Sequence, residues 1–154
     1  MQTVIENIIC TRKYLLDICE PLSIEQLNTI PNGFNNNIIW NIGHLIAAQQ
    51  GICYIRAGLA TIVNESILEQ FKSGSKPNKQ WNLAEFAIIK QTLIDSLDQL
   101  KKDVEQGIFH KYESFQTRYG VSINNFTEAI QFLSFHEGLH TGTIVAIKKL
   151  VTQP

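Results

Sequence analysis

Two histidines that stand four residues apart are the first feature of this sequence that suggests chemistry. His136 and His140 occur in the run FHEGLHTGTI. On a helix, residues four apart share one face with their Cβ atoms roughly 5–6 Å apart, so both imidazoles can bind one metal ion. The helical period puts the pair in an apolar seam, which also holds Ala129, Phe132, Leu133, Thr143 and Ile147. A buried imidazole needs a hydrogen-bond partner or a metal. The spacing predicts a divalent metal site, and hydrogen-bonded packing without an ion is the alternative.

A third histidine lies in a segment with small neighbours. His44 occurs in NNNIIWNIGHLIAAQQ, and Ala47, Ala48 and Gly51 follow it at helical spacing, which leaves room for a pocket on its face. Three neutral imidazoles with an open fourth position are typical of catalytic zinc and also suit nickel and other first-row ions. His110 falls in a predicted loop and is interpreted as a surface residue.

Four segments with a helical period must position these histidines. We expect long helices over residues 3–19, 38–57, 83–106 and 126–151, each bounded by capping or turn residues. The connections contain a capping pattern at Ser23, a short helix near residues 64–71, a solvated loop at 72–79 and an aromatic loop at 107–125. Two strands could form in the aromatic loop, around residues 109–115. The pattern predicts an all-α protein with one domain over residues 1–154, an up-down four-helix bundle.

Composition and charge exclude several classes of partner. The net charge of −1 offers no basic excess for a phosphate backbone, so no nucleic-acid partner is expected. No signal peptide is visible, and polar residues such as Asn41 and Gln49 interrupt the longest apolar run. We therefore expect a cytoplasmic protein with no membrane partner. Its three cysteines lack a CxxC spacing and are expected to be reduced thiols.

The sequence around the histidines, together with the helical pattern, resembles that of the DinB/YfiT-like superfamily. The resemblance extends over essentially the whole chain. In that family a Trp-x-x-x-His run on the second helix joins an HxxxH pair on the last long helix, which Gly usually follows two residues on. Trp40, His44, His136, His140 and Gly142 match in order. The resemblance implies that the three histidines hold one divalent ion, zinc or nickel first and manganese or iron next. It also implies a homodimer, and in some members a low-molecular-weight thiol cosubstrate.

The reaction stays open between several hypotheses. An ion with an open position can activate a thiol or a water, so thiol-dependent transfer to a small molecule comes first and hydrolysis second. A non-catalytic, metal-stabilised binding or stress-response bundle is the alternative from another class. HEGLH also matches the zinc-protease HExxH, with Glu137 as the base. We disfavour a peptidase, because Glu137 points about 100° away from His136 on the helix and no third ligand follows downstream.

Neighbouring residues have weaker assignments. Asn41, three residues before His44, could line the pocket, and Thr143 could bond a water on the ion or, as is usual in a helix, the carbonyl behind it. Gly138 and Gly142 could admit a second helix or subunit, or could equally be tolerated flexibility in the helix. The aromatic loop could cover the pocket mouth or pack under the bundle.

Overall fold

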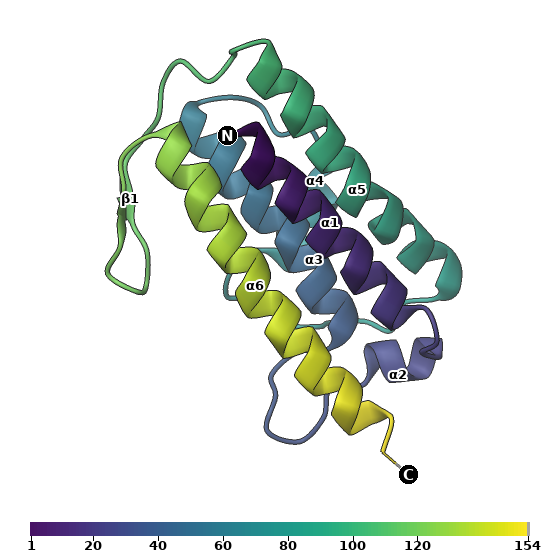
Figure 1. The fold of residues 1–154 in the computed structure, drawn as a ribbon. Coiled ribbons are helices and arrows are strands. Elements are labelled where there is room, and N and C mark those ends of the chain that lie inside the picture. Colours follow the sequence, from purple (N-terminus) through teal and green to yellow (C-terminus); the bar gives the residue numbers. More distant parts are fainter. Residues whose placement is uncertain (154) are drawn as a thin grey trace.

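The computed structural model describes residues 1–153, and four long helices dominate it (Figure 1). These helices are α1 (Gln2–Cys19), α3 (Ile38–Gln49), α5 (Leu83–Glu105) and α6 (Phe126–Val151). The shorter elements are α2 (Ile24–Asn28), the turns η1 (Gln50–Tyr54) and η2 (Ile55–Ala57) that continue α3, α4 (Glu65–Phe71), and the strands β1 (Phe115–Gln116) and β2 (Ser122–Ile123). The prediction of an all-α bundle is confirmed.

Three of the long helices begin at an asparagine cap. The side chains of Asn37, Asn82 and Asn125 accept hydrogen bonds from backbone N–H groups in the first turns of α3, α5 and α6. Such caps satisfy donors that have no partner inside the helix, which fixes where each helix starts. The short α2 begins with a capping box between Ser23 and Gln26, as its sequence predicted.

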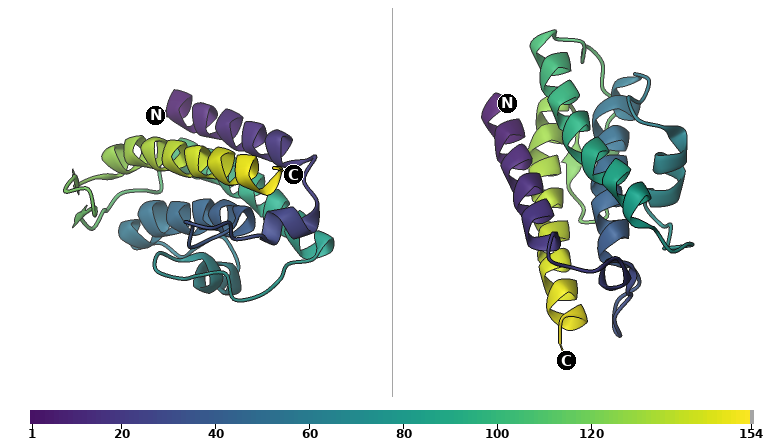
Figure 2. Two further views of the ribbon diagram at one scale, coloured as in Figure 1. Left: turned by 90° about the horizontal axis from the view of Figure 1, so that it is seen from below. Right: turned by 90° about the vertical axis from the view of Figure 1, so that its right-hand side faces the viewer.

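The four helices pack as a bundle in which α3 lies beside α6. The packed pairs are α1 with α6, α6 with α3, α3 with α5, and α5 with α1. Figures 1 and 2 show that α1 and α6 run in one direction and that α3 and α5 run in the other. The bundle therefore departs from strict up-down alternation at one step, because residues 58–82 carry the chain back along the bundle before α5 begins.

The apolar residues of α5 that recur at helical spacing form part of the core. Phe86, Ile89, Leu93, Leu97 and Leu100 are buried, whereas Leu83, the first residue of the helix, is 67% exposed. Among residues 1–153, no helix has the length and apolar character needed to cross a membrane.

The connections border one side of the bundle. The predicted short helix near 64–71 is present as α4, which packs against α3. The predicted strands occur in the aromatic loop, although they lie at 115–116 and 122–123 rather than around 109–115, and pair as an antiparallel hairpin. α4 and this hairpin thus flank the face where α3 meets α6.

Candidate metal centre

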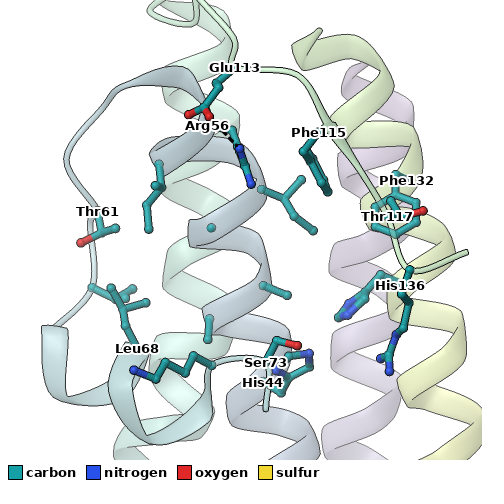
Figure 3. Close-up of a pocket in the computed structure, with 18 of the residues that line it drawn as sticks. His44, Arg56, Thr61, Leu68, Ser73, Glu113, Phe115, Thr117, Phe132 and His136 are labelled. Atoms are coloured by element: carbon teal, nitrogen blue, oxygen red, sulfur yellow. Dashed lines mark ion pairs between the residues drawn. The ribbon is translucent and has the colours of Figure 1, made fainter. Parts of the chain in front are cut away.

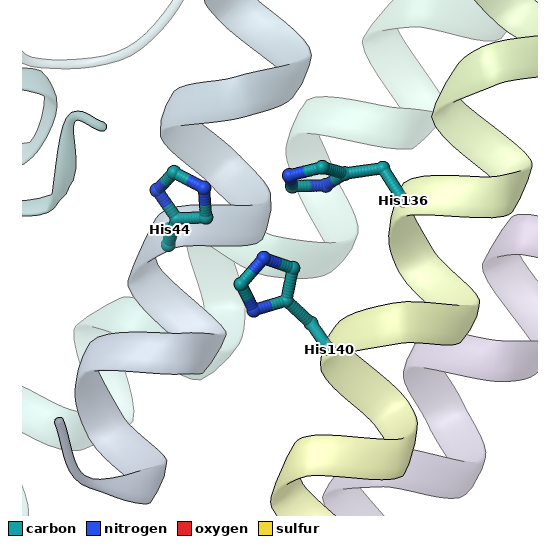
Figure 4. A group of neighbouring side chains, drawn as sticks. All are labelled: His44, His136 and His140. Atoms are coloured by element: carbon teal, nitrogen blue, oxygen red, sulfur yellow. The ribbon is translucent and has the colours of Figure 1, made fainter. Parts of the chain in front are cut away.

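The three predicted histidines lie together between α3 and α6 (Figure 4). His44 extends from α3, and His136 and His140 extend from successive turns of α6. One ring nitrogen from each lies within 4.8 Å of the others. His44 is 5% exposed and His136 8% exposed, so water only partly reaches this cluster. Their role as metal ligands stays a prediction.

Two of the imidazoles are oriented by acceptors behind them. Nδ1 of His44 lies 2.7 Å from the carbonyl oxygen of Phe71, and Nδ1 of His140 lies 2.8 Å from Oδ1 of Asn41. The Asn41 amide nitrogen donates to the carbonyl of Asn37, which turns its oxygen toward His140. Because both partners accept, each Nδ1 carries the proton and each Nε2 is free for an ion. Outer partners of this kind are the usual support of a metal-binding histidine.

The third imidazole has a nitrogen without a partner. Nδ1 of His136 is buried and has no hydrogen-bond partner among residues 1–153. A buried polar atom left in this state is costly in a folded protein. The donor set, the orienting acceptors and this unpartnered nitrogen together fit a divalent ion bound by the three histidines.

Burial keeps the cluster neutral. It lowers the pKa of His136 to about 3 and that of His140 to about 4, and it also lowers the pKa of His44. The positive charge of Arg118 acts in the same direction on all three imidazoles. Neutral imidazoles are the form that binds metal, so the site is ready for an ion well below neutral pH.

Close packing around α3 fixes the His44 ring. The ring of Trp40 stacks on that of His44 with centroids 4.7 Å apart and planes 8° apart. The ring of Phe71 lies over Gly43, where a Cβ would come within 2.4 Å of it. Phe71 can therefore present its carbonyl to His44 only because residue 43 has no side chain.

Glu137 is turned away from the histidines, as the helical geometry predicted. Its carboxylate forms a buried ion pair with Arg12 of α1, with Arg12 Nη2 2.6 Å from Glu137 Oε1. The guanidinium also donates to Gln49 Oε1 and to the carbonyl oxygens of Leu45 and Leu93. Glu137 is thus held inside the bundle and does not act as the base of an HExxH peptidase.

A large cavity opens beside the histidines (Figure 3). It measures about 1070 Å³, and His44 and His136 lie at one end of it, while the ion pair of Arg56 with Glu113 lies at the other. Its walls come from the second half of α3, from α4 with the loop before it, from the hairpin and from α6. His140 is absent from this lining, so ligands would reach the cluster on the side of His44 and His136.

A wide helical turn shapes the α3 wall. The π-helical turn η1 follows α3, and such turns are frequent at functional sites. Gln50 in this turn accepts a hydrogen bond from the backbone of Ile62, which ties the loop before α4 to the helix. A Cβ added at Gly51 would meet nothing within 4 Å, which agrees with the open space predicted there.

The other assignments have mixed outcomes. Thr143 donates to the carbonyl of Leu139, the ordinary helical alternative. A Cβ at Gly138 or Gly142 would meet no atom within 4 Å among residues 1–153, so neither glycine admits a second helix of this chain.

The aromatic loop takes both predicted roles, since Phe115 borders the cavity while Phe109 packs against the core. The buried Cys53 is absent from the cavity lining, and His110 is exposed.

Four residues that contribute to this region were not predicted from the sequence: Gly43, Phe71, Arg12 and Arg118. A glycine inside an apolar helix could have indicated that another residue, here Phe71, packs closely against Gly43. A single charge on an apolar helix face could have indicated Arg12. No sequence feature distinguishes Arg118.

A family model for the DinB superfamily matches residues 9–144. The chain belongs to the DinB superfamily. The match begins within α1, includes the three histidines and ends within α6, so it covers most of the bundle together with the site. No curated protein matches the sequence.

Proposed function

We propose that this DinB-superfamily protein is a metal-dependent enzyme acting on a small molecule, with thiol-dependent transfer as the favoured reaction and hydrolysis as the second. The observation that carries the proposal is the position of the cavity, which ends at His44 and His136. An ion that served structure alone would be closed off by a fourth protein ligand. Among residues 1–153, the group that could hold an ion comprises only the three histidines.

In this proposal the Nε2 atoms of His44 and His140, with a ring nitrogen of His136, hold the ion. When bound, a divalent ion supplies Lewis acidity, which makes a thiol or a water in the pocket more acidic. Phe71 and Asn41 keep the rings of His44 and His140 in place. Histidine donors suit zinc and nickel best, with manganese and iron as alternatives.

The positions of the carboxylates support thiol transfer ahead of hydrolysis. Hydrolysis gains from a general base beside the reacting water. Glu137 is paired with Arg12, and Glu69 and Glu113 of the cavity lining are paired with Lys72 and Arg56. The third carboxylate of the lining, Glu65, is the first residue of α4, at the opposite end of that helix from the Phe71 contact with His44. A thiol already acidified by an ion needs no protein base.

We further propose a cytoplasmic homodimer whose partner in the reaction is a small molecule. The cytoplasm supplies low-molecular-weight thiols, and it keeps the three unpaired cysteines of this chain reduced. Size-exclusion chromatography with light scattering tests the dimer, and a monomer at micromolar concentration would contradict it.

The metal content of protein purified without an affinity tag tests the site. We expect about one equivalent of divalent metal in the wild type. The variant His136→Ala/His140→Ala should lose it, and the control His110→Ala, which changes an exposed loop histidine, should keep it. Absence of metal from the wild type even after incubation with zinc or nickel would overturn the proposal.

Spectroscopy of the cobalt-substituted protein tests the open position. Adding cysteine should produce a sulfur-to-cobalt charge-transfer band, because the cavity gives the thiol access to the ion. A spectrum that does not respond to any small thiol or anion would instead support a closed, purely structural ion. Trp40 provides a second readout, since its stacking on His44 should make its fluorescence sensitive to cobalt in a Trp81→Phe background.

A further inference from the structure

Arg118 is a cation of the cavity that lacks a charged partner. It follows β1 in the hairpin, is exposed, and borders the cavity together with His44 and His136. Among residues 1–153 its guanidinium forms no ion pair and no side-chain hydrogen bond. Its one marked contact is with the ring of Tyr119, 5.4 Å from the guanidinium carbon to the ring centroid.

The other two cations that line the cavity are neutralised. Arg56 pairs with Glu113 at 3.1 Å, and Lys72 pairs with Glu69 at 2.6 Å. The remaining carboxylate of the lining, Glu65, is the first residue of α4, at the opposite end of that helix from Phe71, whose carbonyl contacts His44. The free positive charge of the cavity is therefore the one on Arg118.

This charge shares a cavity with the candidate metal centre. Arg118 borders the cavity together with His44 and His136. A divalent ion on three neutral imidazoles would add two positive charges. Glu113 and Glu69 of the lining are already paired with Arg56 and Lys72, so a ligand that brings a negative charge is favoured.

The rest of the wall is largely apolar. It includes side chains from α3, η1, α4, the hairpin and α6, namely Ala47, Ile52, Leu68, Phe115 and Phe132. A ligand that fills this space should bury an apolar body against these side chains.

We propose that Arg118 is a specificity-determining residue that binds the carboxylate of a small organic acid, whose apolar body lies along the cavity wall. The two parallel N–H groups of a guanidinium match the two oxygens of a carboxylate. A phosphate group usually takes several donors or a helix N-terminus, and Arg118 is a single donor group. The inference deepens the proposed function and rests on it for the identity of the site.

Paired ligands that differ only in charge test the inference. We would titrate zinc-loaded and metal-free wild-type protein with 4-phenylbutyrate, 4-phenylbutanamide and 4-phenylbutyl phosphate by calorimetry. The carboxylate should bind about tenfold tighter than the amide to the metal-free protein, and the preference should be larger in the zinc-loaded protein, because the ion adds positive charge. The preference should shrink when the salt concentration is raised to about 0.5 M, because Arg118 is exposed.

Two variants separate charge from packing. Arg118→Gln should abolish the preference for the carboxylate in the metal-free protein and leave binding of the amide unchanged. The matched control Arg56→Gln, which removes the paired arginine of the same cavity, should retain the preference. Equal binding of carboxylate and amide by the wild type, or retention of the preference in metal-free Arg118→Gln, would overturn the inference.

The outcomes also separate this inference from the proposed function. A protein that binds no metal but prefers the carboxylate through Arg118 would support the inference and contradict the metal-dependent enzyme. A protein that binds zinc without that preference would do the reverse. Tighter, Arg118-dependent binding of the phosphate ester would overturn the choice of a carboxylate.

Discussion

The carbonyl oxygen of Phe71 lies 2.7 Å from Nδ1 of His44, so the last residue of α4 orients a candidate ligand on α3. The Phe71 ring reaches this position by lying directly over Gly43, the residue before His44. The packing of α4 against α3 and the tautomer of His44 therefore depend on the same residue, Phe71. It explains why a glycine, a poor helix former, lies in the middle of an apolar helix.

Gly43→Ala should weaken metal binding by about tenfold, because the new Cβ would displace Phe71 and its carbonyl. Overpacking should lower the free energy of unfolding by about 1–3 kcal/mol, more than the helix propensity of alanine restores. Calorimetric zinc titration and denaturant unfolding measure the two effects.

Two glycines of α6 supply the controls for this variant. Gly138→Ala and Gly142→Ala add a methyl group into open space near His140. Each should raise the free energy of unfolding by up to about 1 kcal/mol and leave zinc affinity unchanged. Unchanged zinc affinity in Gly43→Ala would show that Phe71 does not position His44.

The helix boundaries were predictable because their signals are local. Asn82 caps α5 and Asn125 caps α6 at the positions that the sequence indicates, since a capping residue acts within its own first turn. The histidine cluster was predictable for a related reason, because the four-residue spacing fixes two of its members on one face. The small residues that follow His44 indicated the third member, and the family resemblance then grouped it with the pair.

The supporting contacts were not predictable because they join distant parts of the chain. Arg12 and Glu137 are 125 residues apart, and nothing near either residue indicates the other. The π-helical turn and the parallel course of α3 and α5 likewise depend on tertiary packing rather than on a local signal. Arg118 looks like any surface arginine until the hairpin brings it to the cavity.

Asn41→Ala should lower zinc affinity by about 10–100-fold, because His140 would lose the acceptor that fixes its tautomer. Asn41→Asp keeps an oxygen at this position and should retain most of the affinity. Zinc titrations of the two variants, with circular dichroism to confirm helix content, measure the difference. If both variants bind zinc as the wild type does, Asn41 has no role at the site.

Arg12→Met should lower the free energy of unfolding by about 3–5 kcal/mol, because it leaves the buried Glu137 carboxylate without its partner. The double variant Arg12→Met/Glu137→Met should recover much of this loss, since no buried charge remains. Denaturant unfolding of the two variants measures the coupling. Additive losses would contradict it.

The same pair distinguishes a structural Glu137 from a catalytic one. Glu137→Gln should be less stable than the wild type but should bind zinc with similar affinity, because its carboxylate faces Arg12 and not the histidines. A stable Glu137→Gln protein that has lost only its catalytic rate would revive the HExxH interpretation.

The stability of the metal-free protein should fall as the pH drops below about 6.5. The pKa of His136 is lowered to about 3 and that of His140 to about 4 in the folded state, from 6.5 in the unfolded chain. Between these values the unfolded chain binds protons that the folded protein does not bind, so acid favours unfolding. Each histidine should lower the free energy of unfolding by up to about 1.4 kcal/mol for every pH unit that the pH falls within this window. Above pH 6.5 none of this stability is lost.

His136→Gln isolates this effect from the titration of carboxylates. Unfolding of metal-free wild type and variant between about pH 4.5 and 7.5, which covers the upper part of the window, should give a shallower pH dependence for the variant, by up to about 1.4 kcal/mol per pH unit. Zinc at saturation should hold the wild type stable to lower pH, because the bound ion competes with the proton for the same nitrogen atoms. Parallel curves for the metal-free wild type and variant would mean that His136 titrates alike in the folded and unfolded states, which its burial in the bundle argues against.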